Sequence, residues 1–365
     1  MSAEHPIMIC TELYDFDSFS IDQIGGENDR EITLLSACKW DKSTLTVRFL
    51  DGEQVVKDRV KKYANEWSKY ANVKFVFVDS GPADIRISFK LDGSWSYVGK
   101  CINSSLTQDE ATMNYGWLTP ETPDDEYARV VLHEFGHALG FVHEHQHPYS
   151  PIPWNVQVVY DYYWRTLMWD KEEVDRNIID KYSAQVTNFS DFDPDSIMIY
   201  AIPNDVTIGN YETTWNKKLS RLDKEFVSRW YPYYITSRSS GDYSGKLLAV
   251  DHTSGSLMMV NNRTHNGAGW RIIKDNDIVR FQSVGDGAYF GQYLDVSTTS
   301  GVVKMHNDPS HSGTKWRIVN EGGYPKIISA SSGKYNGKRL TVNTTKGTIW
   351  MKGAASHTGT RWQIA

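Results

Sequence analysis

The sequence contains few cysteines and no long hydrophobic run. Only Cys10, Cys38 and Cys101 occur in 365 residues, too few for the disulfide framework of many secreted proteins. No apolar stretch is long enough to span a bilayer. Residues 1–17 also lack the basic start and long apolar core of a signal peptide. The sequence therefore predicts no membrane span and a chain that is cytoplasmic as synthesised, and it leaves open release or secretion by a non-classical route.

Clustered charge of one sign is also missing. Lys and Arg number 39 against 45 Asp and Glu, which gives a formal net charge of −6 at pH 7. No run of basic residues forms the electrostatic footprint of a nucleic-acid groove. Hydrophobic residues make up 40% of the chain and charged residues 23%, as in ordinary globular proteins. We therefore expect no nucleic-acid partner, and the length allows two domains.

Histidine, in contrast, is concentrated in one short stretch. Five of the eleven histidines lie between His133 and His147. His133 and His137 are four residues apart, so a helix places both on one face, about one turn from each other. Glu134 lies beside them and can act as a general base on water at a zinc ion. This spacing predicts a catalytic metal site on a helix.

The residues that follow can supply a third nitrogen. Gly140 permits the left-handed backbone with which many helices end. The reversed chain can then bring His143 to the same metal. Three neutral imidazoles with one open position are typical of a catalytic zinc site rather than a structural one. We therefore predict that Zn2+ is bound by His133, His137 and His143.

Residues 133–143, taken together, resemble the metzincin signature. Glu144, directly after the third histidine, narrows the resemblance to the astacin family of zinc endopeptidases. Residues 196–200, Ser-Ile-Met-Ile-Tyr, match the methionine turn that astacins write Ser-x-Met-x-Tyr. The resemblance implies that Met198 lies beneath the metal. It also implies that Tyr200 is a fifth zinc ligand at rest and swings away to stabilise the transition-state oxyanion.

The elements before the zinc helix agree with this family. Strand-like patterns at Leu45–Phe49, Val73–Val78 and Ile85–Phe89, with an amphipathic helix over Glu53–Tyr70, resemble the upper subdomain of astacins. Thr112–Trp117 is expected as an edge strand of the cleft, where an extended peptide can pair. The expected fold is an α+β metzincin domain with a twisted mixed sheet and a zinc helix.

The cysteines allow two further expectations. Many secreted astacins carry two disulfides, and Ser94 stands where one half-cystine would be expected, so these cross-links are expected to be absent. Residues 1–35 form a separate N-terminal segment, a possible prosegment or leader. Cys10 within it has two interpretations: a thiolate that occupies the open zinc position and holds the enzyme latent, or a small buried residue.

The second half of the chain repeats itself three times. The recurring positions are 46 residues apart and carry glycine turns between strand-like segments. An internal repeat of this size indicates one supersecondary unit in three copies. The repeats resemble a β-trefoil of the ricin B type, a frequent carbohydrate-binding module. Matched residues are Leu248, Leu294 and Leu340; Met259, Met305 and Met351; His265, His311 and His357; and Trp270, Trp316 and Trp362.

The residues that ricin-type lectins use for sugar are only partly present. That family places an aspartate after the first repeated leucine, an aromatic residue on the next strand, and an Asn-Gln pair before the tryptophan. The aspartate occurs only as Asp295, since Ala249 and Thr341 replace it. Repeat two, with Asp295 and His306, is therefore the candidate carbohydrate site. Glycine stands in place of the asparagine in all three repeats, at Gly267, Gly313 and Gly359.

These observations predict a zinc metalloendopeptidase followed by an all-β trefoil. The expected domains are an N-terminal segment at 1–35, a catalytic domain at 36–236 and a trefoil at 241–365. Glu134 and Tyr200 are the catalytic residues, proteins or peptides are the substrates, and the trefoil is expected to bind carbohydrate or glycoprotein. The alternative is a carbohydrate-binding lectin whose peptidase domain is latent or inactive. A chelator-sensitive protease assay separates the two.

Overall fold

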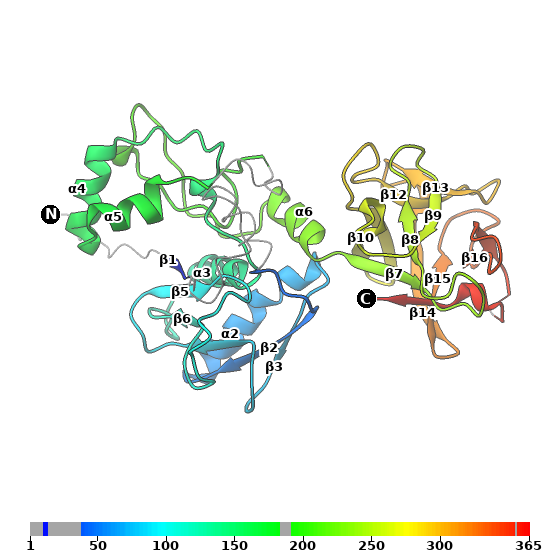
Figure 1. Cartoon of the computed structure of the whole chain (residues 1–365), viewed down its shortest axis with the longest axis horizontal. Helices are drawn as coiled ribbons and strands as arrows, with labels where there is room; N and C mark the ends of the chain where they lie inside the picture. The colour runs from blue at the N-terminus through cyan, green and yellow to red at the C-terminus, as the bar shows by residue number, and fades with distance from the viewer. Residues whose placement is uncertain (1–9, 14–37, 183–190, 355) are drawn as a thin grey trace, which may run out of the picture. The chain divides into compact units, whose positions relative to one another are not determined.

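The computed structural model describes residues 10–13, 38–182, 191–354 and 356–365 (Figure 1). These residues separate into two compact units, with a boundary between Asp223 and Lys224 and with residues 68–73 in the second unit. Apart from Cys10–Leu13, the predicted N-terminal segment 1–35 lies outside the described residues. The predicted domain limits at 36–236 and 241–365 stay predictions.

A six-stranded sheet forms the framework of the first unit. Only β5 and β6 run antiparallel to each other, and the other neighbouring pairs are parallel. The predicted α+β domain with a mixed sheet is confirmed. In spatial order the strands are β1 (Cys10–Leu13), β5 (Ser94–Tyr97), β6 (Met113–Tyr115), β4 (Ile85–Ser88), β2 (Thr44–Phe49) and β3 (Lys74–Phe77).

The strand predicted to form the edge of the cleft lies inside the sheet. Asn114 of β6 pairs with Ser88 of β4 on one side and with Trp95 of β5 on the other. Its side-chain amide also donates to Leu91 O and Gly93 O, at 2.8 and 2.6 Å. The expectation for Thr112–Trp117 is therefore wrong, because β5 turns back along β6 and covers it. The strand outside β5 is β1.

Helices of the first unit pack around this sheet and its loops. They are α2 (Gln54–Ala64), α3 (Asp124–Ala138), α4 (Val156–Leu167) and α5 (Lys171–Val174), which continues as a π-helical turn (Asp175–Ile179). Short 3-10 turns occupy Trp67–Lys69, Glu144–Gln146 and Asn204–Val206, and α6 (Arg221–Trp230) crosses into the second unit. The helix predicted over 53–70 is thus α2 followed by a 3-10 turn.

Helix α3 is held by its ends and by buried aromatic side chains. Its first turn carries three acidic residues, which favour the positive end of the helix dipole. Trp67 is fully buried and donates its Nε1–H to Leu132 O at 3.0 Å. Phe135 packs edge-on against Phe75 of β3, with ring centroids 4.9 Å apart. Gly140 has a φ of 97°, so the chain turns there as predicted.

Cys38 and Cys101 form a disulfide in this unit, with their Cα atoms 5.0 Å apart. The expectation of no cross-link, which rested on Ser94, is therefore wrong. The disulfide is buried next to the start of the loop after β5, where Gly99 N donates to His137 O of α3 at 2.8 Å. Because disulfides persist mainly in oxidising compartments, cysteine content no longer argues for a reducing environment.

Removing this disulfide should destabilise the chain. The bond joins residues 63 apart in sequence. Replacing both partners (Cys38→Ser with Cys101→Ser) frees the unfolded chain and should lower the free energy of unfolding by about 2–4 kcal/mol. Urea denaturation with and without a reductant measures this loss. Reductant should weaken the native chain and leave the double variant unchanged; equal stability of the two oxidised proteins would contradict the expectation.

Residues 233–365 of the second unit form an all-β trefoil of three similar repeats. Its hairpins pair equivalent residues, since Leu248, Leu294 and Leu340 face Met259, Met305 and Met351. The predicted trefoil is confirmed. Its strands are β7 (Tyr233–Ser237), β8 (Leu247–Val250), β9 (Leu257–Val260), β10 (Gly269–Asp275), β11 (Ile278–Ser283), β12 (Tyr293–Val296), β13 (Val303–His306), β14 (Trp316–Glu321), β15 (Tyr324–Ser329), β16 (Arg339–Val342), β17 (Ile349–Lys352) and β18 (Trp362–Ile364).

The repeated tryptophans fix each hairpin to the strand that follows it. All three are fully buried. Each indole donates to the carbonyl oxygen of the leucine 22 residues earlier, at 2.8–3.0 Å. A buried hydrogen bond of this kind adds about 1 kcal/mol of net stability and prevents the larger cost of an unpaired indole N–H. The donors are Trp270, Trp316 and Trp362.

A second repeated contact closes the trefoil into a ring. In every repeat a tyrosine ring lies so close to a glycine turn of the preceding copy that a Cβ on the glycine would approach it within 2.1–2.4 Å. The three contacts run around the whole unit and return to the start, so no repeat is left with an open end. The pairs are Tyr289 on Gly255, Tyr335 on Gly301 and Tyr243 on Gly347.

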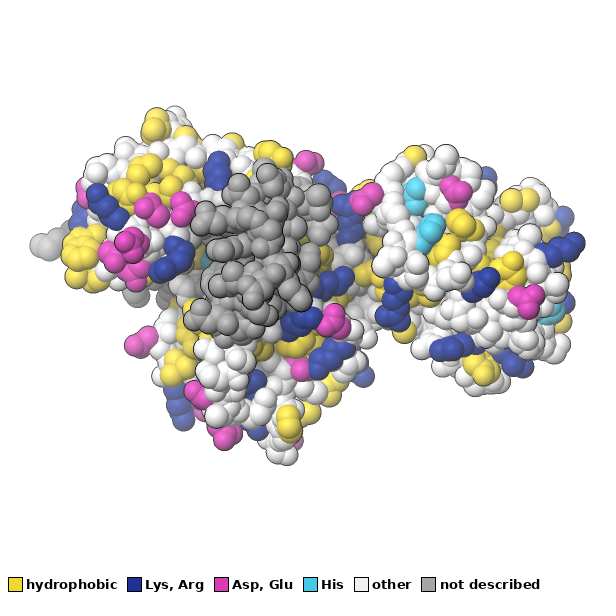
Figure 2. Space-filling model, viewed as in Figure 1, with side chains coloured by type: hydrophobic (Ala, Val, Ile, Leu, Met, Phe, Trp, Pro, Cys, Tyr) yellow, Lys and Arg dark blue, Asp and Glu magenta, His cyan; other side chains and the backbone are white. Residues whose placement is uncertain are grey.

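The surface and the helices add two observations. On the face drawn in Figure 2, basic and acidic side chains of the trefoil are interspersed, and histidine side chains reach the surface. Within the part of the chain that the structure describes, every helix is too short or too polar to cross a membrane.

Candidate functional site

Helix α3 and the turn after it bring three histidine side chains together. His137 Nε2 lies 3.1 Å from His133 Nε2 and 3.2 Å from His143 Nε2. All three side chains are buried. The spacing of four residues along the helix and the reversal at Gly140 produce this convergence, as the sequence indicated. The three nitrogen atoms form a group that could hold a metal ion.

The hydrogen bonds of the Nδ1 atoms show which nitrogen of a histidine ring carries the hydrogen. His133 Nδ1 lies 2.8 Å from Ile197 O, and His137 Nδ1 lies 2.8 Å from Phe141 O. A carbonyl oxygen only accepts, so each Nδ1 carries the hydrogen and each Nε2 presents a lone pair. The short distance between the Nε2 atoms of His133 and His137 is therefore not a hydrogen bond. A cation bound between these nitrogen atoms would remove the repulsion between their lone pairs.

The donor set and its spacing fit zinc. Nitrogen ligands at the usual Zn–N distance of about 2.0–2.1 Å, in tetrahedral geometry, lie roughly 3.3–3.4 Å apart, close to the spacing seen here. Burial lowers the pKa of His137 to about 4 and the pKa values of His133 and His143 well below their usual range. Zinc requires neutral imidazoles, and these three histidines are neutral at pH 7.

Glu134 lies beside the three histidines and is completely buried. One carboxylate oxygen of Glu134, one nitrogen of His133 and the sulfur of Cys10 lie within 4.8 Å of one another. Cys10 comes from β1, which pairs in parallel with β5. Burial, and next the nearby Glu134, raise the pKa of the Cys10 thiol well above its usual value. It is therefore a neutral thiol unless a cation lies next to it.

The methionine turn lies against α3 through a glycine that the sequence motif does not require. A Cβ on Gly136 would approach Met198 Sδ to 2.3 Å, so a larger residue there would displace the end of the Met198 side chain. Glu144 N donates to Met198 O at 3.1 Å. Met198 therefore packs on the helix that carries the histidines, in agreement with its expected place beneath the metal.

Asp223, which the sequence analysis did not single out, fixes the same turn. It is buried and accepts from Ser196 Oγ at 2.8 Å, Ile197 N at 2.9 Å and Ser220 N at 2.8 Å. Burial raises the pKa of Asp223, and these donors oppose that shift. Ile197 O in turn accepts from His133 (2.8 Å), so Asp223 orients the histidine through the turn. Its only signal in the sequence is an acidic residue in the first turn of a helix, α6, and such residues are too common to stand out.

Tyr200 is buried close to the histidines. Its ring centroid lies 4.4 Å from that of His143 and 4.4 Å from that of His145. The rings of Tyr200 and His145 are stacked, with an interplanar angle of 25°. Its hydroxyl donates a short hydrogen bond to Cys10 O. The side chain predicted to stabilise an oxyanion thus binds a carbonyl oxygen of the chain's own N-terminal strand.

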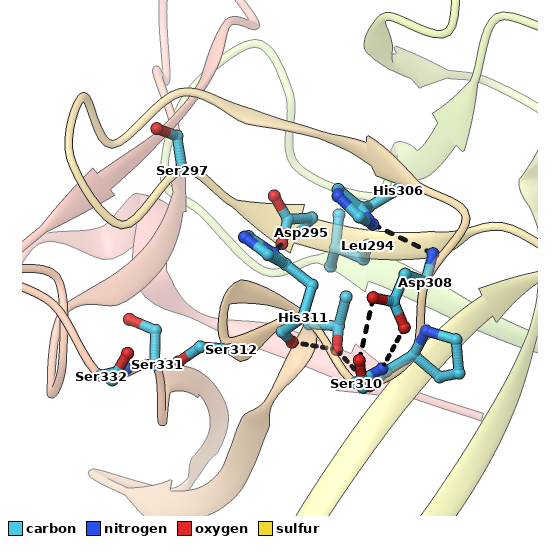
Figure 3. A network of polar contacts seen from close by, with 12 residues as sticks. Leu294, Asp295, Ser297, His306, Asp308, Ser310, His311, Ser312, Ser331 and Ser332 are labelled. Carbon is cyan, nitrogen blue, oxygen red and sulfur yellow. Dashed lines mark hydrogen bonds and ion pairs between the residues drawn. The ribbon is translucent and has the colours of Figure 1, made fainter.

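The predicted sugar residues of repeat two lie together in the second unit (Figure 3). Asp295 has no exposed side-chain surface, and its Oδ1 lies 2.6 Å from His311 Nδ1. His306 and His311 stack with centroids 4.4 Å apart and an interplanar angle of 9°. His311, which sequence reasoning left as one of three repeated histidines, is therefore part of this cluster.

The lectin-type asparagine is excluded by the backbone in all three repeats. A Cβ at these glycines would lie 1.8–2.2 Å from the carbonyl oxygen of the preceding hairpin strand. Any side chain there would force the strands apart. The positions are Gly267 against Val250 O, Gly313 against Val296 O and Gly359 against Val342 O.

The mixed sheet, the histidine triad with its glutamate, and the methionine turn define the class of the first unit. It is that of a zinc metalloendopeptidase of the metzincin type. The sequence model of the astacin peptidase family matches residues 34–226, which is more than half of the chain. The chain belongs to the astacin family.

Relatives of known structure or name agree with this assignment. A solved structure of myroilysin is 43% identical, covers 54% of this chain and 97% of its own, and superposes with a TM-score of 0.52. Stromelysin-3 of Mus musculus is 27% identical over 140 residues, and zinc metalloproteinase nas-30 of Caenorhabditis elegans is 31% identical over 124. The two matches cover 33% and 34% of this chain, and they span 28% and 15% of the length of those two proteins.

Proposed function

We propose that this chain hydrolyses internal peptide bonds of proteins, with Zn2+ held by His133, His137 and His143. The observation that carries the proposal is the convergence of three histidine Nε2 atoms beside a buried carboxylate, with His137 Nε2 3.1 and 3.2 Å from the other two. A lectin with a decayed peptidase would have no reason to retain that arrangement, in which the Nδ1 atoms of His133 and His137 are held by carbonyl oxygens.

Each nearby side chain has a distinct task in this proposal. A bound zinc ion supplies a Lewis acid that polarises a carbonyl group and makes water more acidic. Glu134 takes the proton from the attacking water and returns it to the leaving amine. The Tyr200 hydroxyl donates to the oxyanion, which would lie where Cys10 O accepts its hydrogen bond now. The edge of β5, which β1 covers, would pair with the extended substrate.

Removal and return of the metal tests this proposal. Dialysis of the purified chain against a zinc chelator should abolish cleavage of casein, since the histidines alone cannot polarise the scissile carbonyl. One equivalent of Zn2+ should restore most of the rate, and elemental analysis should find about one zinc per chain in the starting material. Activity that survives complete metal removal, or metal-free protein that zinc does not activate, would overturn the assignment.

The trefoil is the second part of the proposal. Residues 241–365 bind carbohydrate, on a glycan or a glycoprotein, through repeat two with Asp295 and His306. This module would hold the catalytic domain, residues 36–236, near glycosylated substrates and raise their effective concentration. What supports it is that repeat two alone breaks the threefold symmetry: it has a buried aspartate and a stacked histidine pair where the other repeats have Ala249 or Thr341.

A further inference from the structure

The three repeated histidines do not make the same hydrogen bond. His265 Nδ1 accepts from Gly267 N and His357 Nδ1 accepts from Gly359 N, both at 3.1 Å. His311 makes no such bond. Its Nδ1 faces Asp295 Oδ1 at 2.6 Å instead. The buried Asp295 carboxylate thus replaces the backbone N–H as the partner of Nδ1 in His311.

This difference fixes which nitrogen of each ring carries hydrogen. A carboxylate only accepts, so His311 Nδ1 is the donor, and Nε2 of the neutral ring is an acceptor. In His306 the order is reversed, because Nδ1 accepts from Asp308 N at 3.0 Å and the hydrogen is on Nε2. Among the described residues, neither Nε2 atom has a hydrogen-bond partner. The stacked pair therefore presents one acceptor and one donor side by side.

The loop that carries these rings is held in place. The Asp308 carboxylate accepts from Ser310 N at 2.8 Å and from Ser310 Oγ at 2.9 Å (Figure 3). Pro309 O accepts from Arg280 Nε at 2.9 Å and from Thr314 Oγ1 at 3.0 Å. A ligand that meets the two imidazoles would lose little binding energy to ordering the loop.

We infer that His306 and His311 form a paired donor and acceptor for two adjacent hydroxyl groups of a sugar, with Asp295 as the residue that orients His311. One hydroxyl donates to His311 Nε2 while its neighbour accepts from His306 Nε2. Asp295 is fully buried beneath His311, whose side chain is 36% exposed, so His311 is the group that reaches the ligand. This inference rests on the proposed carbohydrate binding and names the chemistry that it would recognise.

Binding of the full chain to glycoproteins with terminal galactose or mannose tests the pair. His311→Asn retains a donor for Asp295 but has no acceptor at the place of Nε2, and it should weaken binding by roughly tenfold or more, the scale of one lost ligand hydrogen bond. His306→Ala should do the same. The matched variants His265→Ala and His357→Ala, altered at the equivalent places in the other repeats, should bind within about twofold of the native chain, since only repeat two carries the pair.

Chemical change of the ligand gives an independent test. Periodate cleaves the bond between carbons that carry adjacent hydroxyl groups, so glycoproteins oxidised with periodate and reduced with borohydride should no longer be bound. Equal binding before and after this treatment would overturn recognition of a diol. The side-chain ¹⁵N signals of the native protein should also show hydrogen on Nδ1 in His311 and on Nε2 in His265 and His357. The same tautomer in all three would overturn the role of Asp295.

The outcomes separate this inference from the proposed function. If the native chain binds a glycoprotein and His311→Asn binds it equally well, the histidine pair is not the site, while carbohydrate binding stands. If the native chain binds neither glycoprotein, the carbohydrate part of the proposed function fails and the inference fails with it. Cleavage of casein is measured in parallel and should be unchanged in His265→Ala and His357→Ala, which lie outside the proposed sugar site.

Discussion

Replacing Glu134 with alanine should leave zinc bound and remove almost all cleavage of casein. Glu134 is not one of the three histidines proposed to hold zinc, His133, His137 and His143, so the metal content of Glu134→Ala should equal that of the native chain. The lost function is transfer of the water proton to the leaving amine. General acid–base catalysis of this kind contributes about 10²–10⁴-fold, so kcat/KM should fall by that factor.

A surface carboxylate on the same helix provides the matched control. Asp125 lies in the first turn of α3, and its side chain is 56% exposed and paired with Lys217 at 2.5 Å. Asp125→Asn removes one negative charge from α3 without touching the histidines, so it should retain nearly full activity. The variants are compared by initial rate on casein and by zinc content. Native activity in Glu134→Ala would remove Glu134 from the mechanism; loss of its zinc would make it a structural residue.

The sequence predicted those parts of the site whose residues lie close together along the chain. His133, Glu134 and His137 occupy one turn of a helix, and Gly140 and His143 follow within six residues, so spacing alone determines that they converge. The trefoil was predictable for a related reason. Three copies of a 46-residue pattern show which positions share one environment, even though the strands that meet are far apart in the sequence.

The parts that were missed depend on contacts between distant segments. Gly136 is glycine because Met198 approaches it from 62 residues away in sequence, and nothing in the helix pattern reveals that contact. β5 was not expected as an outer strand, because its place in the sheet depends on pairing with β6 and β1. His311 looked equivalent to its two counterparts; the available signal was Asp295, the one residue that breaks the threefold pattern.

For Cys10, the sequence suggested two interpretations but did not show which residues lie next to it in the fold. The residue is buried, as the simpler interpretation required. It is buried, however, within 4.8 Å of ligand atoms of His133 and Glu134, more than 120 residues away along the chain. Arg129 Nη1 lies 4.0 Å from its sulfur, and its carbonyl oxygen accepts from Tyr200. The strand β1 thus lies beside Glu134, binds the Tyr200 hydroxyl and covers the edge of β5 that we propose for substrate.

Replacing Cys10 with serine should therefore raise the initial rate of casein cleavage by the freshly purified chain. Thiolate is a strong zinc ligand and a hydroxyl is a weak one, so the variant loses the contact that would hold β1 over the metal. A rise of about tenfold corresponds to a shift of ~1.4 kcal/mol in the equilibrium between covered and open sites. Thr11→Ala, in the same strand, is the matched control and should retain the slow native rate.

The zinc environment gives a second measurement that does not depend on activity. X-ray absorption at the zinc edge should show one sulfur neighbour in the latent native chain and none in Cys10→Ser. Sulfur at the metal together with a faster variant would establish that the N-terminal strand blocks the site through its thiol. No rise in the initial rate would remove the latency hypothesis, and Cys10 would then be a buried residue that packs β1 against β5 and α3.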